Sequence, residues 1–304
     1  MPSELSKFVS AHLELVIGAI VAIAGGFAGA WAGARAAQKT ADRSKNRDEG
    51  IREIRNTNAA IMVVAAICNS MLGLKKQHVK PIKEAFDAHQ AEFDEYRKLR
   101  KSGQIAVSAT FDLKVDGRTL ALPSLPIDVL QRTVFKDLSL VGRPLALQIV
   151  IGQTAQSLTD SISKRNDLVS SFKNDPAVRR NLVSVYFGLQ QSTGVLDESY
   201  PSTLDAMNRF TDDLIFFSLF LLKDLKLHGT ELSIAFRKTF GGPLIQTSEA
   251  DFSQSKNLFP DEANYHDWLA NFEVRPRAKS KTVQFIDGQI TKLKKLAPLV
   301  WKNR

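Results

Sequence analysis

The stretch IGAIVAIAGGFAGAWAGARAA, residues 17–37, decides how the rest of the chain is interpreted. It lies in an uncharged run of 20 residues, 15–34. At about 1.5 Å of rise per residue, a helix of that length spans about 30 Å, which matches the hydrocarbon core of a bilayer. The run therefore predicts one transmembrane helix over residues 15–34, preceded by a short translocated N-terminus, residues 1–14.

Two other interpretations of this run compete with an uncleaved span. The Ala-x-Ala tripeptides within residues 28–34 resemble the cleavage site of a signal peptide. Against cleavage, the run exceeds the roughly 7–15 residues of a signal peptide's apolar region, and Glu4 and Glu14 offset the charge of Lys7. A buried helix of a soluble domain seldom stays uncharged over such a length. We therefore favour the membrane span.

The charges on either side of the run predict its orientation. Lys7 is the one basic residue before it, whereas five basic residues follow within residues 35–47. By the positive-inside rule, the more basic flank stays in the cytoplasm. We therefore expect a single-pass protein of the inner (cytoplasmic) membrane, with the N-terminus outside, a basic juxtamembrane segment over residues 35–56 and the C-terminal domain in the cytoplasm.

Small residues form a stripe along the predicted span. They recur every four residues in two adjacent rows: Gly18, Ala22 and Gly26, and Gly25, Gly29 and Gly33. In lipid there is little hydrophobic drive for helices to associate, so close approach across small residues supplies the contact. The stripe predicts helix–helix association of the glycine-zipper kind and hence a homo-oligomer. The competing interpretation is that small residues are common in membrane helices generally.

After residue 51, apolar side chains follow a strict 3,4 spacing up to Tyr96, which is typical of a coiled-coil seam. The spacing predicts a helix about 70 Å long, kinked at Pro81 and weakened at Gly73. Asn58 falls on an a-type position, where a lone asparagine can fix register and oligomer state. The competing interpretation of Asn58, which we favour, is a satisfied polar group inside a bundle of this chain's own helices.

A strand pattern follows the long helix. Apolar and polar residues alternate over residues 107–115, and Asp116-Gly117, a preferred pair for a two-residue turn, comes next. Folding back across this turn sets Leu113 opposite Leu120 on one face. The pattern predicts a β-hairpin at 107–122 that lies against the helices.

Helices are expected in the rest of a cytoplasmic domain over residues 57–240. Three of them are predicted, over residues 144–173, 176–190 and 203–227, the last ending at Gly229. The run 214–222 is apolar on almost all sides, which predicts the central, most buried helix.

The predicted fold class is therefore mainly α: one N-terminal transmembrane helix, a long kinked helix and a cytoplasmic helical bundle with a β-hairpin insertion. A loop-rich linker and a basic amphipathic C-terminal helix complete the chain over residues 241–304.

No recognisable catalytic motif occurs in the sequence. It contains no P-loop, GxGxxG, GxSxG, HExxH or paired CxxC, and the single cysteine, Cys68, excludes an internal disulfide framework. His78 and His89 could share a helix face, but the intervening Pro81 is expected to spoil their register. Arg165 and Asn166 are expected to make a polar contact inside the bundle. We therefore expect no catalytic residue, no metal and no cofactor.

The C-terminal tail holds most of the net charge of +9. Residues 274–304 contain nine basic residues and one acid, Asp287. The candidates for contact with lipid or another anion are Arg275, Arg277, Lys279, Lys281, Lys292, Lys294 and Lys295. Anionic membrane lipid suits a domain tethered near a negatively charged leaflet. A solvated basic face on a packed helix competes with it, and nucleic acid is the less favoured partner because aromatic residues are few.

Taken together, these patterns predict location and assembly rather than chemistry. The expected function is that of a membrane-anchored, self-associating helical protein, which acts by protein–protein contact as a scaffold or as a pore-forming or membrane-perturbing effector, for instance in antiviral defence against phage. Its protein partner is unknown. The alternatives are an enzyme with a non-local site and a membrane-tethered protein that binds nucleic acid through the basic tail.

Overall fold

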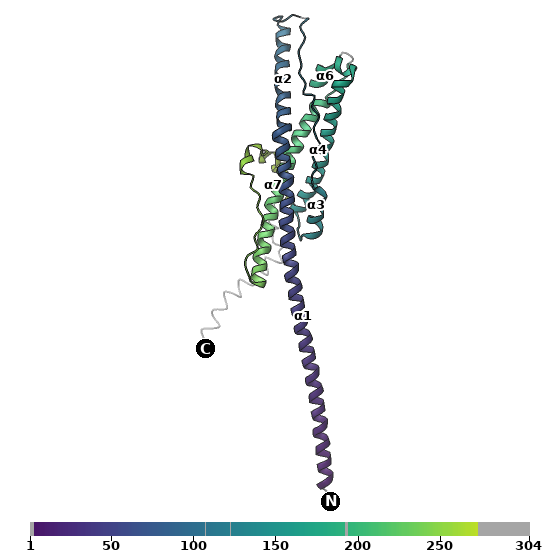
Figure 1. Ribbon diagram of the computed structural model, residues 1–304, viewed down its shortest axis with the longest axis vertical. Helices are drawn as coiled ribbons and strands as arrows, with labels where there is room; N and C mark the ends of the chain where they lie inside the picture. The colour runs from purple at the N-terminus through teal and green to yellow at the C-terminus, as the bar shows by residue number, and fades with distance from the viewer. Residues whose placement is uncertain (1–2, 107, 122, 192–193, 273–304) are drawn as a thin grey trace, which may run out of the picture. The chain divides into compact units, whose positions relative to one another are not determined.

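The computed structural model describes residues 3–106, 108–121, 123–191 and 194–272, and this part of the chain is mainly helical (Figure 1). It divides into two compact units, one up to Leu258 and one that begins at Phe259. In the second unit a short 3₁₀ turn, η4 (Glu262–Tyr265), leads into helix α8 (His266–Ala270). The seven basic tail residues predicted to contact lipid lie outside the described residues.

The first unit begins with one uninterrupted helical rod. Helix α1 (Ser3–Leu74) has 72 residues, which corresponds to about 108 Å, and it continues through η1 (Lys75–Val79) into α2 (Lys80–Lys101). The predicted span and the predicted long helix are therefore parts of a single helix. Residues 35–49, which join them, are rich in Ala, Arg and Lys, and these residues favour helix.

Among the described residues, one helix near the N-terminus, Gly29–Lys101, is long and apolar enough to cross a membrane by length and composition. Its most apolar window is 44% buried within the protein, so that part serves the bundle core. Residues 29–49, by contrast, are exposed along their whole length.

The disturbance predicted at Pro81 takes the form of a π-helical turn. The Lys80 N–H donates to the Lys75 carbonyl, five residues back, and Pro81 lies in the first turn of the helix that follows. A proline inside a regular helix clashes with the carbonyl four residues earlier, and the wider π turn gives its ring room. Gly73 lies inside the regular part of α1.

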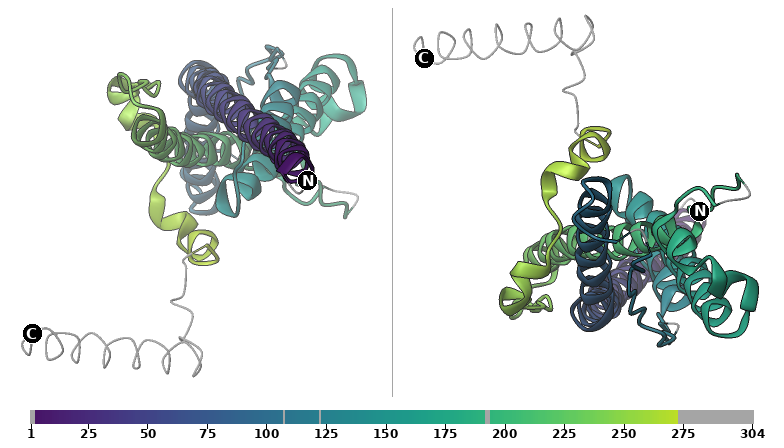
Figure 2. Two further views of the ribbon diagram at one scale, coloured as in Figure 1. Left: turned by 90° about the horizontal axis from the view of Figure 1, so that it is seen from below. Right: turned by 90° about the horizontal axis from the view of Figure 1, so that it is seen from above.

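Helix α7 (Ser199–Phe240) is the centre of the bundle. It packs against both α1 and α4 (Arg143–Asn174), as Figure 1 and the end-on views of Figure 2 show. Its apolar run is buried as predicted, at Leu214, Ile215, Phe216, Phe217, Phe220 and Leu221.

Gly229 does not end this helix, which corrects the prediction. Helix α7 continues for 11 further residues, to Phe240, and Gly241 follows it with φ 78°. A Cβ atom added at Gly229 would lie 2.8 Å from Thr247 Cγ2 and 3.1 Å from Thr57 Cγ2. The glycine is therefore needed for the close approach of α1, α7 and the segment after α7.

The predicted β-hairpin at 107–122 is also corrected, because the described residues 108–121 form no strand. They run as an extended segment along α2 and α4 (Figure 1). Helix side chains bind part of its backbone. Tyr96 donates to the Ala109 carbonyl at 2.7 Å, and Asn166 both donates to and accepts from the Leu120 backbone at 2.8 Å. Asp116 accepts from the Arg118 N–H at 3.0 Å, so it makes a local turn instead of a hairpin.

The apolar face of this segment packs as expected. Phe111, Leu113 and Val115 lie against a cluster of aromatic side chains that includes Phe93 and Phe187. Figure 1 also labels α3 (Ile127–Arg132) and α6 (Leu182–Phe187). The single helix predicted over residues 176–190 is instead two, α5 (Pro176–Arg180) and α6, separated at Asn181.

After α7 the chain returns along α1. The Asn58 amide donates to the Gln246 carbonyl at 3.1 Å and accepts from the Ser248 N–H at 2.8 Å. Lys75 Nζ donates to the Leu258 carbonyl at 2.9 Å, at the end of η3 (Ser253–Leu258). Asn58 is thus bound within its own chain, and its role in oligomer register stays a prediction.

Candidate functional site

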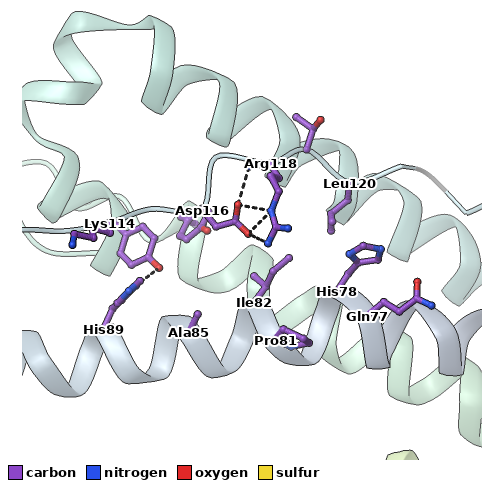
Figure 3. Close-up of a pocket in the computed structure, with 13 residues that line it drawn as sticks. Gln77, His78, Pro81, Ile82, Ala85, His89, Lys114, Asp116, Arg118 and Leu120 are labelled. Atoms are coloured by element: carbon purple, nitrogen blue, oxygen red, sulfur yellow. Dashed lines mark hydrogen bonds and ion pairs between the residues drawn. The ribbon is translucent and has the colours of Figure 1, made fainter.

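A pocket of about 380 Å³ lies where the π turn and α2 meet the extended segment 108–121 (Figure 3). Its helical wall combines the apolar side chains of Ile82 and Ala85 with the rings of His78 and His89. The two histidines therefore line one pocket, and the expectation that Pro81 would separate them is wrong. His78 is part of the π turn, which lets the helix pass Pro81 with both rings on this side.

The extended segment contributes the charged side of the pocket. Arg118 donates to both carboxylate oxygens of Asp116, from Nε at 3.0 Å and from Nη2 at 2.9 Å. These hydrogen bonds hold the pKa of Asp116 below its ordinary value, although partial burial opposes them. Figure 3 shows the pair facing the helix that carries Ile82. Lys114 also lines the pocket, and its ammonium group has no hydrogen bond or ion pair with the described residues.

Two buried tyrosines close the inner end of the pocket. The Tyr186 hydroxyl lies 3.1 Å from His89 Nδ1, and the ring centroids of Tyr186 and Tyr200 are 4.9 Å apart. Burial raises the pKa of both phenols, so both keep their protons at neutral pH. They present hydroxyl groups that can donate or accept a hydrogen bond.

Arg165 of α4 lies behind the two tyrosines, and none of its surface is exposed. Its Nη1 donates to the Arg118 carbonyl at 2.8 Å, while Nε and Nη2 meet no hydrogen-bond partner among the described residues. The charge of Arg165 acts on Tyr186, Tyr200 and Asp116, which all line the pocket. Burying a charge costs several kcal/mol unless it is paired and hydrogen-bonded, and Arg165 is so only in part, so this arginine needs a reason beyond packing.

Part of this site is predicted by the sequence. The predicted polar contact of Arg165 and Asn166 inside the bundle is confirmed. The pocket itself was missed, although Arg165 gave a signal. It continues the buried stripe of α4 between Ile162 and Val169, where a charged residue is out of place.

The other predicted site residues lie elsewhere. Gly26, Gly29 and Gly33 are on the exposed part of α1, with nothing within 4 Å of an added Cβ. Gly18, Ala22 and Gly25 belong to the same helix. Cys68 is buried in the core, which raises the pKa of its thiol to about 12 and makes it the inert cysteine expected. No group of three His, Cys, Asp or Glu that could hold a metal occurs in the described part of the chain.

The chain was also compared with known proteins. No family model, curated protein or solved structure matches it. What the protein does therefore has to be inferred from its own residues and their geometry.

Proposed function

We propose that this is a membrane-anchored, self-associating helical protein that acts by protein–protein contact at the cytoplasmic face of a bacterial inner membrane. The observation that carries the proposal is the uninterrupted rod from Ser3 to Lys101. One helix contains both the uncharged run 15–34 and the first core residues of the bundle, beginning with Ile54.

The connection between span and bundle is stiff. From the end of the run at residue 34 to Ile54 there are 20 residues of helix, or about 30 Å. A flexible linker would be rich in Gly and Ser, whereas this segment carries helix-favouring Ala, Lys and Arg. In the proposed protein, the stiff helix fixes the distance between the bundle and the bilayer. A rotation of the span about its own axis also rotates the buried part of α1 against α7.

Self-association is assigned to the span, because the seam after residue 51 is already occupied. Ile54, Ile61 and Cys68 of that seam are buried within the chain's own bundle. The glycine stripe, in contrast, has no neighbour among the described residues at Gly26, Gly29 and Gly33. A single-span protein has no second membrane helix of its own to cover such a surface, so a second copy is the natural occupant.

Trp31 supports a membrane boundary in this region. Its side chain is 66% exposed, and the Arg35 guanidinium lies 5.2 Å from its ring centroid. Trp and basic residues together mark the level of lipid headgroups. The proposal includes both forms of action that a membrane-held cluster of bundles permits: a scaffold for a protein partner, and a membrane-perturbing effector of phage defence.

Crosslinking of the full-length protein in membranes tests the proposal. Gly29→Leu should reduce the crosslinked oligomer at least severalfold, because leucine separates helices that meet across glycine. Gly73→Leu is the matched control, since Gly73 is another α1 glycine with no atom within 4 Å of an added Cβ. A reporter fused after Arg304 checks that each variant keeps its C-terminal domain in the cytoplasm. Wild-type assembly in both Gly29→Leu and a Gly25→Leu/Gly33→Leu double variant would contradict the proposal.

A further inference from the structure

We propose that the pocket beside the π turn binds a small soluble phosphate ester, held through its phosphate by Arg118 in the positive field of Arg165 and Lys114. The proposal goes beyond membrane anchoring. It concerns a different part of the molecule and stands or falls independently of self-association.

The first support is the buried charge of Arg165, which Asp116 and the Tyr200 hydroxyl offset only in part. Its side chain is fully buried, and two of its N–H-bearing nitrogens have no partner among the described residues. Asp116 is the pocket carboxylate that interacts with this charge, but it already accepts hydrogen bonds from both the backbone and the guanidinium group of Arg118. Arg165 and Lys114 thus leave the pocket with a net positive charge, which favours an anionic ligand.

The second support is that donors remain available for an anion. Arg118 uses Nε and Nη2 on Asp116, so Nη1 is left to bind a further acceptor. Its side chain is 88% exposed and can therefore reach a ligand from solvent. Arginine and lysine are the side chains that proteins use most for phosphate, because their hydrogen bonds to it are charge-assisted.

The third support is the size and lining of the pocket. About 380 Å³ is within the range of small-molecule sites and too small for a folded partner. Ile82 and Ala85 offer an apolar surface to the body of the ligand, and the His89–Tyr186 pair offers polar groups. π turns inside helices occur frequently at functional sites, and His78 of this pocket belongs to one.

The distance along the rod indicates that the phosphate is not a lipid headgroup. His78 lies 44 residues beyond residue 34, which corresponds to about 66 Å of helix. A bilayer with its headgroups is about 40–45 Å thick in total, so headgroups near residue 34 stay far from the pocket. The ligand is therefore expected to come from solution.

Calorimetric titration of the full-length protein in phosphatidylcholine nanodiscs without detergent, at low salt, tests the inference. The probes are adenosine monophosphate, adenosine, inorganic phosphate and vesicles containing phosphatidylglycerol. Adenosine monophosphate should bind, and inorganic phosphate should compete with it. Adenosine and the vesicles should not displace it.

Three exposed positions make the test specific. Arg118→Ala should weaken binding of adenosine monophosphate by about tenfold, the effect expected for one lost charge-assisted contact. Lys114→Ala should weaken it less, because it removes only part of the positive field. Asp116→Asn should instead tighten it by about threefold, because it removes a negative charge and frees Arg118. Lys136→Ala, which removes an exposed cation outside the pocket, is the control and should change nothing.

The opposite signs separate electrostatics from damage to the fold, since a misfolded pocket would weaken binding in every variant. Four results would overturn the inference: no binding of either phosphate compound, equal affinity for adenosine, displacement by the vesicles, and unchanged affinity in a Lys114→Ala/Arg118→Ala double variant.

Discussion

Helix α1 has two regions with the same backbone conformation and different surroundings, one exposed and one in the bundle. Residues 29–49 are exposed on all sides, whereas eight residues between positions 57 and 72 are buried against the bundle. The exposed region holds its shape through Ala, Lys and Arg, which favour helix locally. The buried region contains Val64 and Ile67, which are weaker helix formers, and it is helical because tertiary packing against the bundle stabilises the helix. Local preference and tertiary packing thus extend the same rod by different means.

The largest expected effect comes from truncating one buried side chain of this helix. Ile61→Ala should lower the free energy of unfolding by about 2–5 kcal/mol, because it leaves a cavity beside α7. Its neighbour Met62, 58% exposed, is the control, and Met62→Ala should change stability by less than about 0.5 kcal/mol. Denaturant unfolding followed by circular dichroism measures both. Similar costs for the two variants would show that this region is not core.

A pair of glycines sharpens the comparison with an effect of intermediate size. Gly229→Ala should destabilise the protein by about 1–3 kcal/mol, because the new Cβ meets Thr247 and Thr57. Gly73→Ala should stabilise it by up to about 1 kcal/mol, since the added methyl group has open space and alanine favours helix. Melting temperatures of the two variants should therefore move in opposite directions. A stabilised Gly229→Ala variant would contradict the close approach at that point.

The smallest expected effect is a dependence on pH at Glu53, where α1 enters the bundle. Burial acts to raise the pKa of Glu53, but hydrogen bonds from Ser139 and the charge of His228 outweigh it and lower the pKa. The resulting stabilisation is present above the ordinary carboxyl pKa of 4.5 and is lost as pH falls through the lower folded-state value.

Glu53→Gln should therefore flatten the decrease in stability on acidification, and Glu49→Gln, on the exposed part of the helix, should not. Unfolding midpoints measured from neutral pH down to about pH 3 compare the two. If stability decreased equally with falling pH in both variants, Glu53 would not be the cause of the loss of stability in acid.

The sequence predicted this fold where one physical effect dominated. The apolar run at Leu214 and Leu221 allowed only a buried helix, and Asp175 before Pro176 marked a helix start, which the structure confirms through the bond from the Ala177 N–H. Prediction failed where distant parts of the chain compete. Gly229 looks like a helix end locally, but Thr57, far away in sequence, makes it a packing residue.

The hairpin was predicted wrongly and the pocket was missed for the same reason. Alternation over residues 108–115 correctly predicted an extended segment with one apolar face, but a period of two does not reveal what satisfies the backbone. Here the side chain of Asn166 makes the hydrogen bonds to the backbone of Leu120, 46 residues earlier, that a second strand would have made. The pocket depends on His89 of α2 lying near Arg118 of the extended segment, whose carbonyl Arg165 of α4 binds, and no local spacing encodes that arrangement.

The tie between Asn58 and the segment after α7 also has a consequence for synthesis of the chain. Asn58 and Ser248 are 190 residues apart, and the buried face of α1 is not covered until α7 has been made. At about 5–20 residues per second, the roughly 170 residues between the end of α1 and the end of α7 take about 8–34 s to translate. During that interval the apolar face of α1 stays uncovered, because α7 has not yet been synthesised. Nascent chains of this protein should therefore depend on chaperones before residue 240 emerges, and much less afterwards.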